Sequence, residues 1–559
     1  MERIRIHAGS GETNARAARI GFVALLAAYL AYGLIFILRM TFVFGGVRRF
    51  ALFDDAMISM RFARNLAEGH GLVWNSGAPA VEGFTNLLWV LYMALLHIFP
   101  FGEARTALAV QLTSLAALAI NLVFVRRLAT RLSNDGGKAF PGASAIAVWF
   151  ALILTAFYLP LNNWALQGME VGVLALITTV ALAFAVRGLE EGRVPFAAYL
   201  LLGIATLVRL DMVVPLVVVT AYLAIADGPE RRRRHAAFGL GAVVLFVGAQ
   251  TLFRVAYYGQ ALPNTYYLKL SGFPIGARIG RGARVFLDFA WRLNPVLFLL
   301  PLAGAWFRLR RKMGRAPGLL LCVLGAQCLY SIWVGGDAWE RWGGANRFIC
   351  VVMPVFFILL GLAVSDAYTF ARRRKWSWAP AASIALLVIS IVQVNLLRGE
   401  PTPRGLLLID RPLEAWGDSW ATVDAYAIRA VTTEDASVAV VWAGSIPYFS
   451  RRPSIDLLGR CDARIARGPA HPGDFYPGHM KWDYAWSIGE LKPDVIAQFW
   501  SLDDPASYTT LAAVPEDARP FVEGNYALAD IGGYRMLLRK GSPRILWDKV
   551  RPYLKEPGN

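Results

Sequence analysis

The sequence has few charged residues, and this shortage excludes an ordinary water-soluble protein. Only 17% of the 559 residues are charged, whereas 56% are hydrophobic. A typical globular domain carries about a quarter charged residues. Several apolar runs reach about 20 residues, the length that crosses a hydrocarbon core of roughly 30 Å. We therefore expect an α-helical polytopic membrane protein.

Cysteine is also scarce, with four in the whole chain. Three of them, Cys322, Cys328 and Cys350, lie in or beside apolar runs, so no disulfide framework is predicted. The histidine and cysteine spacings match no standard zinc motif, and no glycine-rich loop has the strand and helix context of a nucleotide site. The sequence therefore indicates no metal site and no certain cofactor, and a divalent-metal requirement stays open.

Positive charge, by contrast, is abundant, with 57 Lys and Arg against 39 Asp and Glu. In a soluble protein this excess would suggest nucleic acid. Here the basic residues gather in short loops between apolar runs, where the positive-inside rule makes them cytoplasmic anchors. We therefore exclude a nucleic-acid partner and expect a lipid bilayer instead. The four clusters are Arg126, Arg127, Arg131 and Lys138; Arg231 to Arg234; Arg308, Arg310, Arg311 and Lys312; and Arg372 to Lys375.

About eleven transmembrane helices follow from the apolar runs and these basic loops. Because the count is odd and the amino terminus lies inside, the segment after the last helix is outside. The first run is long and no small-residue cleavage site follows it, so we interpret it as a retained helix, not a signal peptide. The predicted spans are 20–40, 105–125, 144–160, 170–187, 196–208, 212–226, 237–257, 291–307, 317–334, 349–369 and 379–397.

Residues 84–99 are apolar enough to be a further span. If they crossed, residues 196–226 would form one long helix and several arginines of the early loops would face outward, against the charge rule. We therefore prefer a helix that lies partly in the outer leaflet, with 196–208 and 212–226 as a hairpin. The charged tip of that hairpin holds Arg209 and Asp211.

The composition changes after residue 398, where no further run of spanning length occurs. Short strand-like segments at 438–441, 495–497 and 534–538 alternate with helical stretches and with Gly, Pro and Asp. We therefore divide the chain into a transmembrane domain, 1–398, and a C-terminal soluble α/β domain, 399–559.

The first external loop, 41–80, is expected to contain an amphipathic helix along the membrane surface. Apolar residues recur at every fourth position from Ile58, Gly69 and Gly71 end the pattern, and Asp54 and Asp55 stand at its start. Acids in a first helical turn commonly complement the helix dipole. Alternatively, one of them is a general base whose pKa the second carboxylate adjusts.

This loop also carries a family resemblance. Residues 53–89 resemble the first external loop of the glycosyltransferase C superfamily, and within it the mycobacterial-type terminal β-(1→2)-arabinofuranosyltransferases. Weaker matches follow in the order of that family, at 164–170, 207–211, 257–269, 335–337 with 347–348, 443–450 and 455–459. The segment 209–211 reads Arg-Leu-Asp where the family more commonly has Arg-Pro-Glu or Arg-Pro-Asp, and the loop after Asp337 is longer than the common form.

The resemblance implies a glycosyltransferase C fold and a donor sugar, arabinofuranose, on a polyprenyl phosphate. It also implies an extracytoplasmic cell-envelope glycan as acceptor and inversion in a single displacement. The enzyme would lie in the bacterial inner membrane, with its C-terminal domain on the periplasmic side. Asp54 would be the general base and Asp55 the second candidate.

Further site residues are expected on the same external face. A leaving phosphate needs cations and hydrogen-bond donors, and interfacial aromatic residues stack on sugars or form an aromatic belt. Each of these charges has an alternative interpretation as a snorkelling or paired interfacial group. The donor candidates are Arg209, Lys269, Arg341, Arg347, His70 and Asn264, and the acceptor candidates are Glu170, Trp339 and Trp482.

Three other functions are compatible with many spans. A related enzyme could move another lipid-linked sugar to a protein or lipid. A transporter or lipid flippase should carry acids near the middle of the membrane on broken helices, often in paired halves, but here the acid pair lies at the outer edge and no inverted repeat is evident. A purely structural envelope protein would not need Asp54.

Overall fold

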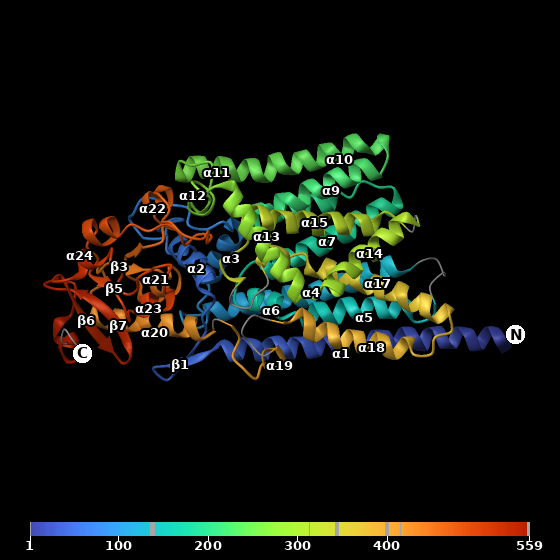
Figure 1. The fold of residues 1–559 in the computed structure, drawn as a ribbon, viewed down its shortest axis with the longest axis horizontal. Coiled ribbons are helices and arrows are strands. Elements are labelled where there is room, and N and C mark those ends of the chain that lie inside the picture. Colours follow the sequence, from blue (N-terminus) through green and yellow to red (C-terminus); the bar gives the residue numbers. More distant parts are fainter. Residues whose placement is uncertain are drawn as a thin grey trace.

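The computed structural model describes residues 2–134, 140–311, 314–340, 346–396, 402–413 and 415–555. Long helices form an elongated bundle, and a smaller mixed α/β region covers one end of it (Figure 1). The predicted fold class, a helical multi-span membrane protein with a C-terminal α/β region, is confirmed. The predicted domain boundary at residues 398 and 399 lies outside the described residues.

Within the described residues, six helical segments are long and apolar enough to cross a membrane, and two bent pairs raise the number to eight. The α5–α6 pair bends by 45°, and the α13–α14 pair by 94°. Three shorter apolar helices, α8, α9 and α18, make up the rest of the predicted eleven, and that count stays a prediction. The six are α1 (Glu2–Met40, apolar from Arg16), α4 (Thr106–Ser133), α7 (Val171–Glu191), the continuous segment Pro229–Tyr258 made of α10 (Pro229–Ala242), η2 (Val243–Gly248) and α11 (Ala249–Tyr258), α15 (Ala316–Trp333) and α17 (Met353–Arg373). The bent pairs are α5 (Ala143–Ala156) with α6 (Leu159–Leu166), and α13 (Ile275–Arg292) with α14 (Pro295–Arg310). The shorter helices are α8 (Phe196–Val208), α9 (Val213–Ala226) and α18 (Ala379–Val394).

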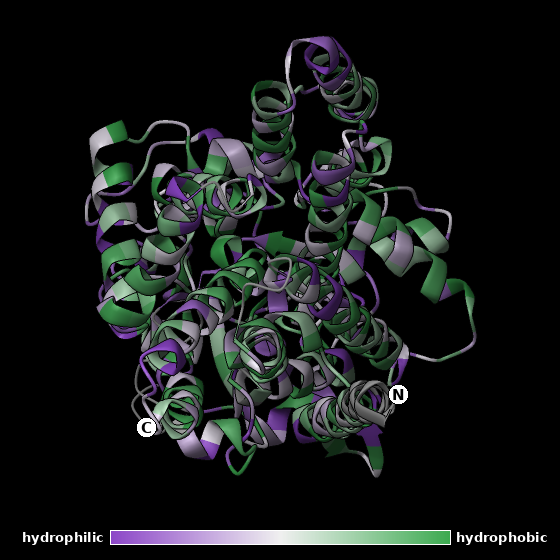
Figure 2. Cartoon of the chain, turned by 90° about the vertical axis from the view of Figure 1, so that its right-hand side faces the viewer, coloured by the Kyte–Doolittle hydropathy of each residue, from purple (hydrophilic) through white to green (hydrophobic). Residues whose placement is uncertain are grey.

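The arginine-rich loops meet at the end of the bundle opposite the C-terminal region (Figure 1). Arg131 at the end of α4 pairs with Glu190 at the end of α7. Arg308 in α14 donates to the Leu132 carbonyl at 3.1 Å. Figure 2 views the bundle from this end, where green hydrophobic residues cover much of the helices. The basic clusters and the C-terminal region therefore lie at opposite ends of the bundle.

Helix α3 (Leu87–Ile98) has both of its ends at the face that carries the C-terminal region. Asn86, just before it, donates to Glu170 at the start of α7 at 3.1 Å. His97, in its last turn, lies 3.0 Å from the Tyr448 hydroxyl in the C-terminal region. Helices α8 and α9 are separate and are joined by a short 3-10 turn, η1 (Leu210–Met212). The structure thus agrees with residues 84–99 remaining on one side and 196–226 forming a hairpin.

The C-terminal region is built on a five-stranded mixed sheet with the order β4-β3-β5-β7-β6. Strand β3 is parallel to β4 and β5, whereas β7 is antiparallel to β5 and β6. The three predicted strand segments are confirmed as β3, β5 and β7. The strands are β3 (Val438–Val440), β4 (Ser454–Asp456), β5 (Val495–Ile496), β6 (Tyr526–Ile531) and β7 (Tyr534–Arg539); the helices are α19 (Thr402–Leu406), α20 (Ala415–Val431), α21 (Ser445–Ser450), α22 (Ala463–Arg467), η4 (Ala485–Glu490), α23 (Pro505–Thr509), α24 (Arg519–Val522), α25 (Trp547–Val550) and η5 (Arg551–Tyr553).

The first external loop is covered by the C-terminal region. It forms a hairpin, β1 (Phe42–Phe44) and β2 (Val47–Arg49), and then α2 (Asp54–Ala67), which begins at the predicted acid pair. Helix α2 packs on α3, and its polar residues Arg61, Arg64 and Asn65 are buried as well. Arg61 donates to the carbonyl of Pro447 at 2.7 Å, and Arg64 to that of Tyr448 at 2.5 Å. The predicted helix that starts at the acid pair is confirmed, and the C-terminal region covers its polar face.

This arrangement makes one continuous hydrophobic core from the bundle into the C-terminal region. Phe62 of α2, Leu118 of α4 and Phe449 of α21 belong to the same buried cluster. A second, smaller cluster includes Ile496 and Leu537 of the sheet. Packing against the bundle on one side and against the C-terminal region on the other therefore fixes the position of α2 and of the acid pair.

Helices α5 and α17 cross closely at Gly361, so a larger residue there should destabilise the bundle. A Cβ at this position would overlap the backbone carbonyl of Ala147, which cannot move away as a side chain can. Gly361→Ala should lower the free energy of unfolding by about 1–3 kcal/mol, measured as a lower Tm in detergent. Gly325→Ala in α15 is the control, because a Cβ there meets nothing within 4 Å; it should leave Tm unchanged or raise it. Equal effects of the two changes would contradict this account.

Candidate active site

Two cavities lie at the amino-terminal end of α2. The first, of about 370 Å³, lies between α2, the α8–α9 tip, α12 (Asn264–Lys269) and α16 (Arg347–Cys350). The second, of about 450 Å³, lies between α2 and the C-terminal region. Asp55 lines the first cavity, Asp54 lines the second, and Arg460 lines both. We call them the membrane-side cavity and the domain-side cavity.

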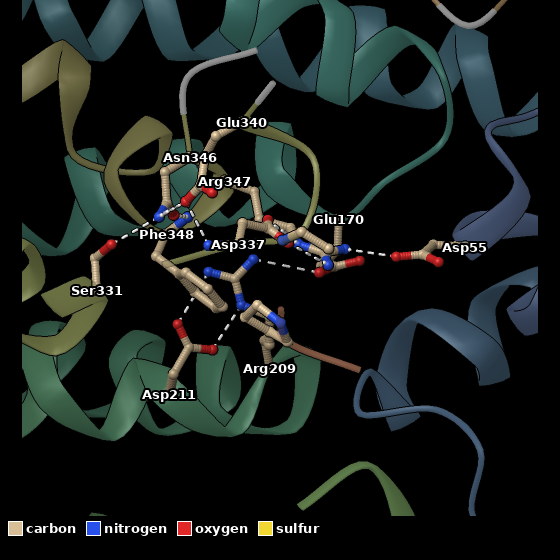
Figure 3. A network of polar contacts seen from close by, with 12 residues as sticks. Asp55, Glu170, Arg209, Asp211, Ser331, Asp337, Glu340, Asn346, Arg347 and Phe348 are labelled. Carbon is tan, nitrogen blue, oxygen red and sulfur yellow. Dashed lines mark hydrogen bonds and ion pairs between the residues drawn. The ribbon is translucent and has the colours of Figure 1, made fainter. Parts of the chain in front are cut away.

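Asp55 is held by two arginines that come from opposite sides. Its carboxylate accepts from Arg347 at 3.1 Å and pairs with Arg460 of the C-terminal region (Figure 3 shows Arg347 reaching it). Burial alone would raise the pKa of Asp55, but the Arg460 and Arg347 guanidiniums outweigh it and hold the pKa well below its usual range. Asp55 is therefore ionised at neutral pH.

Arg347 is fixed before it reaches Asp55. Its Nη2 donates to Asp337 at 3.0 Å, its Nε lies 2.6 Å from the same carboxylate, and its guanidinium packs over the Trp164 ring. Asn346 caps α16 by accepting from the Phe348 amide at 2.8 Å. The side chain of Arg347 therefore has a single orientation, toward the membrane-side cavity.

A second group of paired charges lines the same cavity at the tip of the α8–α9 hairpin. Arg209 donates to Asp211 at 2.6 and 3.0 Å and to Glu170 at 3.3 Å (Figure 3). Glu170 also accepts from Asn86, and Asn86 in turn accepts from Ser59 of α2 at 3.0 Å. The charged tip predicted from the sequence is thus an internally compensated network that faces the cavity.

Lys269 differs from the three cavity arginines. It lines the membrane-side cavity, yet for the described residues the structure records no hydrogen bond or ion pair of its amine. Burial, then the neighbouring Arg347 and Arg460, lowers the pKa of Lys269 to about 8. Lys269 therefore brings a positive charge that has no acid of its own.

Asn264 acts on the backbone of the loop that carries Arg460. Its side-chain amide donates to the carbonyls of Gly459 and Arg460, both at 2.9 Å. The loop also wraps around Asp456, whose carboxylate accepts from the amides of Leu458 at 2.9 Å and Gly459 at 3.1 Å. These contacts position Arg460 between the two cavities.

Asp54 points to the other side of the α2 start. Its carboxylate accepts from the Ser445 amide at 2.7 Å and from the Gly444 amide at 3.2 Å, and it is 5% exposed. Burial raises the pKa of Asp54 to about 6, against the lowering effect of these amides and of Arg460. Both acids lie in the first turn of α2, as predicted, and the N-cap residue is Phe53, which makes no side-chain cap bond.

The remaining predicted site residues are distributed unevenly. Trp339 lines the domain-side cavity and Glu170 the membrane-side cavity. His70 is exposed beyond the carboxyl end of α2. Trp482 stacks on His471 with ring centroids 3.5 Å apart, and it lines neither cavity. Arg341 lies outside the described residues.

The sequence reasoning missed Arg460 and the partnership of Asp337 with Arg347. Arg460 follows directly after the matched segment 455–459, so one more residue of that segment would have included it. Among the described residues, no group of three or more His, Cys, Asp or Glu is arranged to hold a metal ion.

Two curated proteins are similar to this chain, and both are terminal β-(1→2)-arabinofuranosyltransferases. The one from Corynebacterium glutamicum is 26% identical over 351 residues, 56% of this chain and 47% of the relative. The one from Mycobacterium tuberculosis is 24% identical over 372 residues, 60% of this chain and 56% of the relative. The chain thus spans about half the length of the curated relatives it matches. Residues 419–538 match the family model of a domain of unknown function, DUF8728.

Two solved structures share the fold over nearly the whole chain. ArnT from Cupriavidus metallidurans in the apo state superposes with a TM-score of 0.52 at 16% identity, covering 93% of this chain and 98% of ArnT. The apo oligosaccharyltransferase of Archaeoglobus fulgidus superposes with a TM-score of 0.53 at 12% identity, covering 94% of this chain and 75% of the enzyme. Together these comparisons show that the chain has the glycosyltransferase C fold and is a distant homologue of terminal β-(1→2)-arabinofuranosyltransferases.

Proposed function

We propose that this protein is a membrane glycosyltransferase that moves arabinofuranose from a polyprenyl phosphate to an extracytoplasmic glycan of the cell envelope. The observation that carries the proposal is the division of the acid pair. Asp54 and Asp55 are neighbours in the chain, yet each lines a different cavity, and one arginine lines both. Such an arrangement suits a reaction in which donor and acceptor meet between two separate sites.

The membrane-side cavity has the chemistry that a lipid-linked phosphate requires. Arg209, Lys269 and Arg347 line it, together with apolar residues such as Leu262. Cations are the usual partners of a phosphate that leaves with negative charge. The arginines are compensated by acids, so Lys269 is our main candidate for direct contact with the phosphate. Asp55 orients Arg347 and Arg460 around the phosphate.

The proposed reaction is a single displacement with inversion. An acceptor hydroxyl oxygen attacks the anomeric carbon and forms the new glycosidic bond, while the bond between that carbon and the phosphate oxygen breaks. The electron pair of the broken bond leaves with the polyprenyl phosphate. The hydroxyl proton passes to Asp54.

Asp54 fits the role of general base better than Asp55 does. A base is most effective when its pKa lies near the working pH, and the pKa of Asp54 is raised to about 6. Asp55 is bound to two guanidiniums that hold its pKa well below its usual range. The Gly444 and Ser445 amides orient the Asp54 carboxylate without neutralising it.

The proposed location is the bacterial inner membrane, with the C-terminal region on the periplasmic side. The separation of the basic loops from the C-terminal region supports this orientation, because basic loops stay in the cytoplasm. Donor and acceptor would then meet outside the cell. The acid pair lies at this outer end of the bundle and outside the long apolar helices, which argues against a transporter with acids at mid-membrane.

Reconstitution tests the proposal directly. The purified protein in lipid nanodiscs should form an arabinosylated product from polyprenyl-phospho-arabinofuranose and a short arabinofuranoside. The product should show inverted anomeric configuration by NMR, and no product should form without the acceptor. Transfer from a different polyprenyl-linked sugar at a higher kcat/KM would overturn the sugar assignment, and no transfer from any of them would overturn the proposed function.

The pKa of Asp54 predicts a pH dependence. The base must be deprotonated to accept the hydroxyl proton, so kcat/KM should be constant at neutral pH and fall about tenfold per unit below pH 6. The measurement is the acceptor kcat/KM between pH 4.5 and 8, with the fold monitored by circular dichroism at each pH. A profile that stays flat down to pH 5 would exclude Asp54 as the base.

Lys269→Gln tests the donor site. Removing a charge-assisted hydrogen bond costs about 1.5–3 kcal/mol, so the donor KM should rise about 10–100-fold while the acceptor KM stays close to the wild-type value. Lys549→Gln is the matched control, because Lys549 is exposed on the C-terminal region and lines neither cavity. An unchanged donor KM in Lys269→Gln would show that the phosphate binds elsewhere.

A further inference from the structure

Arg254 is the most deeply buried arginine of the described chain, and the proposed reaction gives it no role. It lies near the carboxyl end of α11 and is 1% exposed. Its Nε donates to both carboxylate oxygens of Glu82, at 3.0 and 2.7 Å. Glu82 directly precedes the segment 83–86, which lines the membrane-side cavity. The ion pair therefore joins a bundle helix to one wall of that cavity.

Stability alone does not account for this ion pair. Within the described residues, neither Nη atom of Arg254 has a hydrogen-bond partner, although both atoms are buried. Burial also raises the pKa of Glu82 to about 7, against the lowering effect of Arg254. A buried ion pair with donors left unsatisfied often stabilises a fold no better than apolar side chains of similar volume. The pair is better explained by the segment that it holds in place.

Glu82 connects through its backbone to the loop that carries Arg460. The Glu82 carbonyl accepts from the Asn264 amide at 3.3 Å. The Asn264 side chain in turn donates to the carbonyls of Gly459 and Arg460, both at 2.9 Å. Asn264 therefore links the backbone at Glu82 to the backbone at Arg460.

Gly83 makes a second connection to the same loop. A Cβ on Gly83 would overlap the Sγ of Cys461 and would lie 3.2 Å from the Arg460 carbonyl. The main chain at Gly83 therefore packs directly on residues 460 and 461. Because Glu82 and Gly83 are adjacent, a displacement of Glu82 changes both connections at once.

We propose that Arg254 and Glu82 are positioning residues for Arg460. The ion pair anchors residues 82 and 83 to α11, and these residues hold the Arg460 backbone from the membrane side. The turn around Asp456 holds the same loop from within the C-terminal region. Neither Arg254 nor Glu82 lines a cavity, so both act through Arg460 and not on a substrate.

The position of Arg460 matters for both acids at the start of α2. Arg460 pairs with Asp55 and lowers the pKa of Asp54. If Arg460 moves away, Asp54 loses a cation that stabilises its charged form, and the negative charge of Asp55 is less compensated. Both changes raise the pKa of Asp54. This consequence rests on the proposed function, in which Asp54 is the base, whereas the contacts of Arg460 do not.

The double variant Glu82→Leu with Arg254→Met tests the inference. It removes the pair without leaving a buried charge unpaired, so the protein should fold with a Tm close to that of wild type. The acid limb of the acceptor kcat/KM profile should nevertheless move up by about 0.5–1 pH unit, because Arg460 no longer lowers the pKa of Asp54 as strongly. A role in stability alone would leave this limb at the wild-type pH.

Cys461 provides a second measurement that needs no turnover. Burial raises the pKa of this thiol, and Gly83 covers it, so it should react slowly in wild type. The full-length protein in nanodiscs is treated with N-ethylmaleimide, and modification of Cys461 is followed by peptide mass spectrometry. The rate should rise at least about fivefold in the double variant, because the segment 82–83 is no longer anchored.

Two further variants support the comparison. Arg254→Lys keeps a positive charge beside Glu82 but lacks the Nε–H that both carboxylate oxygens share. It should change both measurements in the same direction by a smaller factor. Asp366→Asn is the matched control, because Asp366 pairs with the buried Arg308 at 2.7 Å at the opposite end of the bundle. It should leave both measurements at their wild-type values.

Three results would overturn the inference. One is a wild-type rate of Cys461 modification in the folded double variant or, should that variant not fold, in Arg254→Lys. Another is an unshifted acid limb in an active double variant. The third is an equal change in Asp366→Asn. If wild type transfers no sugar, the proposed function fails, whereas the Cys461 measurement still decides this inference.

Discussion

The start of α2 is held between the bundle and the C-terminal region, and the site depends on this contact. Asp54 is bound by the backbone of the C-terminal region, and Asp55 by one arginine from each side. Gly444 allows the approach, because a Cβ there would overlap the backbone carbonyl of Asp54. Without the C-terminal region, Asp54 would lose its amide donors and Asp55 one of its two cations. The region is therefore part of the site and not an appended module.

Charge compensation then separates the two acids chemically. Two carboxyl groups on neighbouring residues would ordinarily titrate close together. Here burial dominates at Asp54 and paired guanidiniums dominate at Asp55, so their pKa values move in opposite directions. In the proposed reaction, this difference lets Asp54 accept a proton near neutral pH while Asp55 stays ionised beside its two arginines. The same pairing leaves Lys269 as a cation without an acid of its own.

The multi-span bundle, the helix that begins at the acid pair and three of the strands could be predicted because each depends on local pattern. The apolar runs and basic loops predicted the helical bundle, and α2 begins at the acid pair, as the sequence predicts. The predicted span 291–307 was less accurate, since α14 begins at Pro295 after Asn294, whose side chain caps it by accepting from the Val296 amide at 2.9 Å. That Asn-Pro pair is a start signal that could have been found.

The site itself could be predicted only in part, because its contacts join distant segments. The Asp55–Arg460 pair joins residues 405 positions apart, and the turn around Asp456 that positions Arg460 has no signal in the hydrophobic pattern. A polar face on a helix is compatible with exposure to water and with packing against another polar surface. The sequence therefore did not predict that the C-terminal region covers Arg61 and Arg64. The division of Asp54 and Asp55 between two cavities likewise needed three-dimensional structure.

The most direct test of this division is a comparison of donor binding and single-turnover transfer in Asp54→Asn and Asp55→Asn. The protein is loaded with polyprenyl-phospho-arabinofuranose, the bound donor is quantified by native mass spectrometry, and acceptor is then added. Our account predicts that Asp54→Asn binds donor as wild type does but transfers at least about 1000-fold more slowly, since it lacks the base, whereas Asp55→Asn has altered donor affinity. Transfer by Asp54→Asn at the wild-type rate would contradict the account.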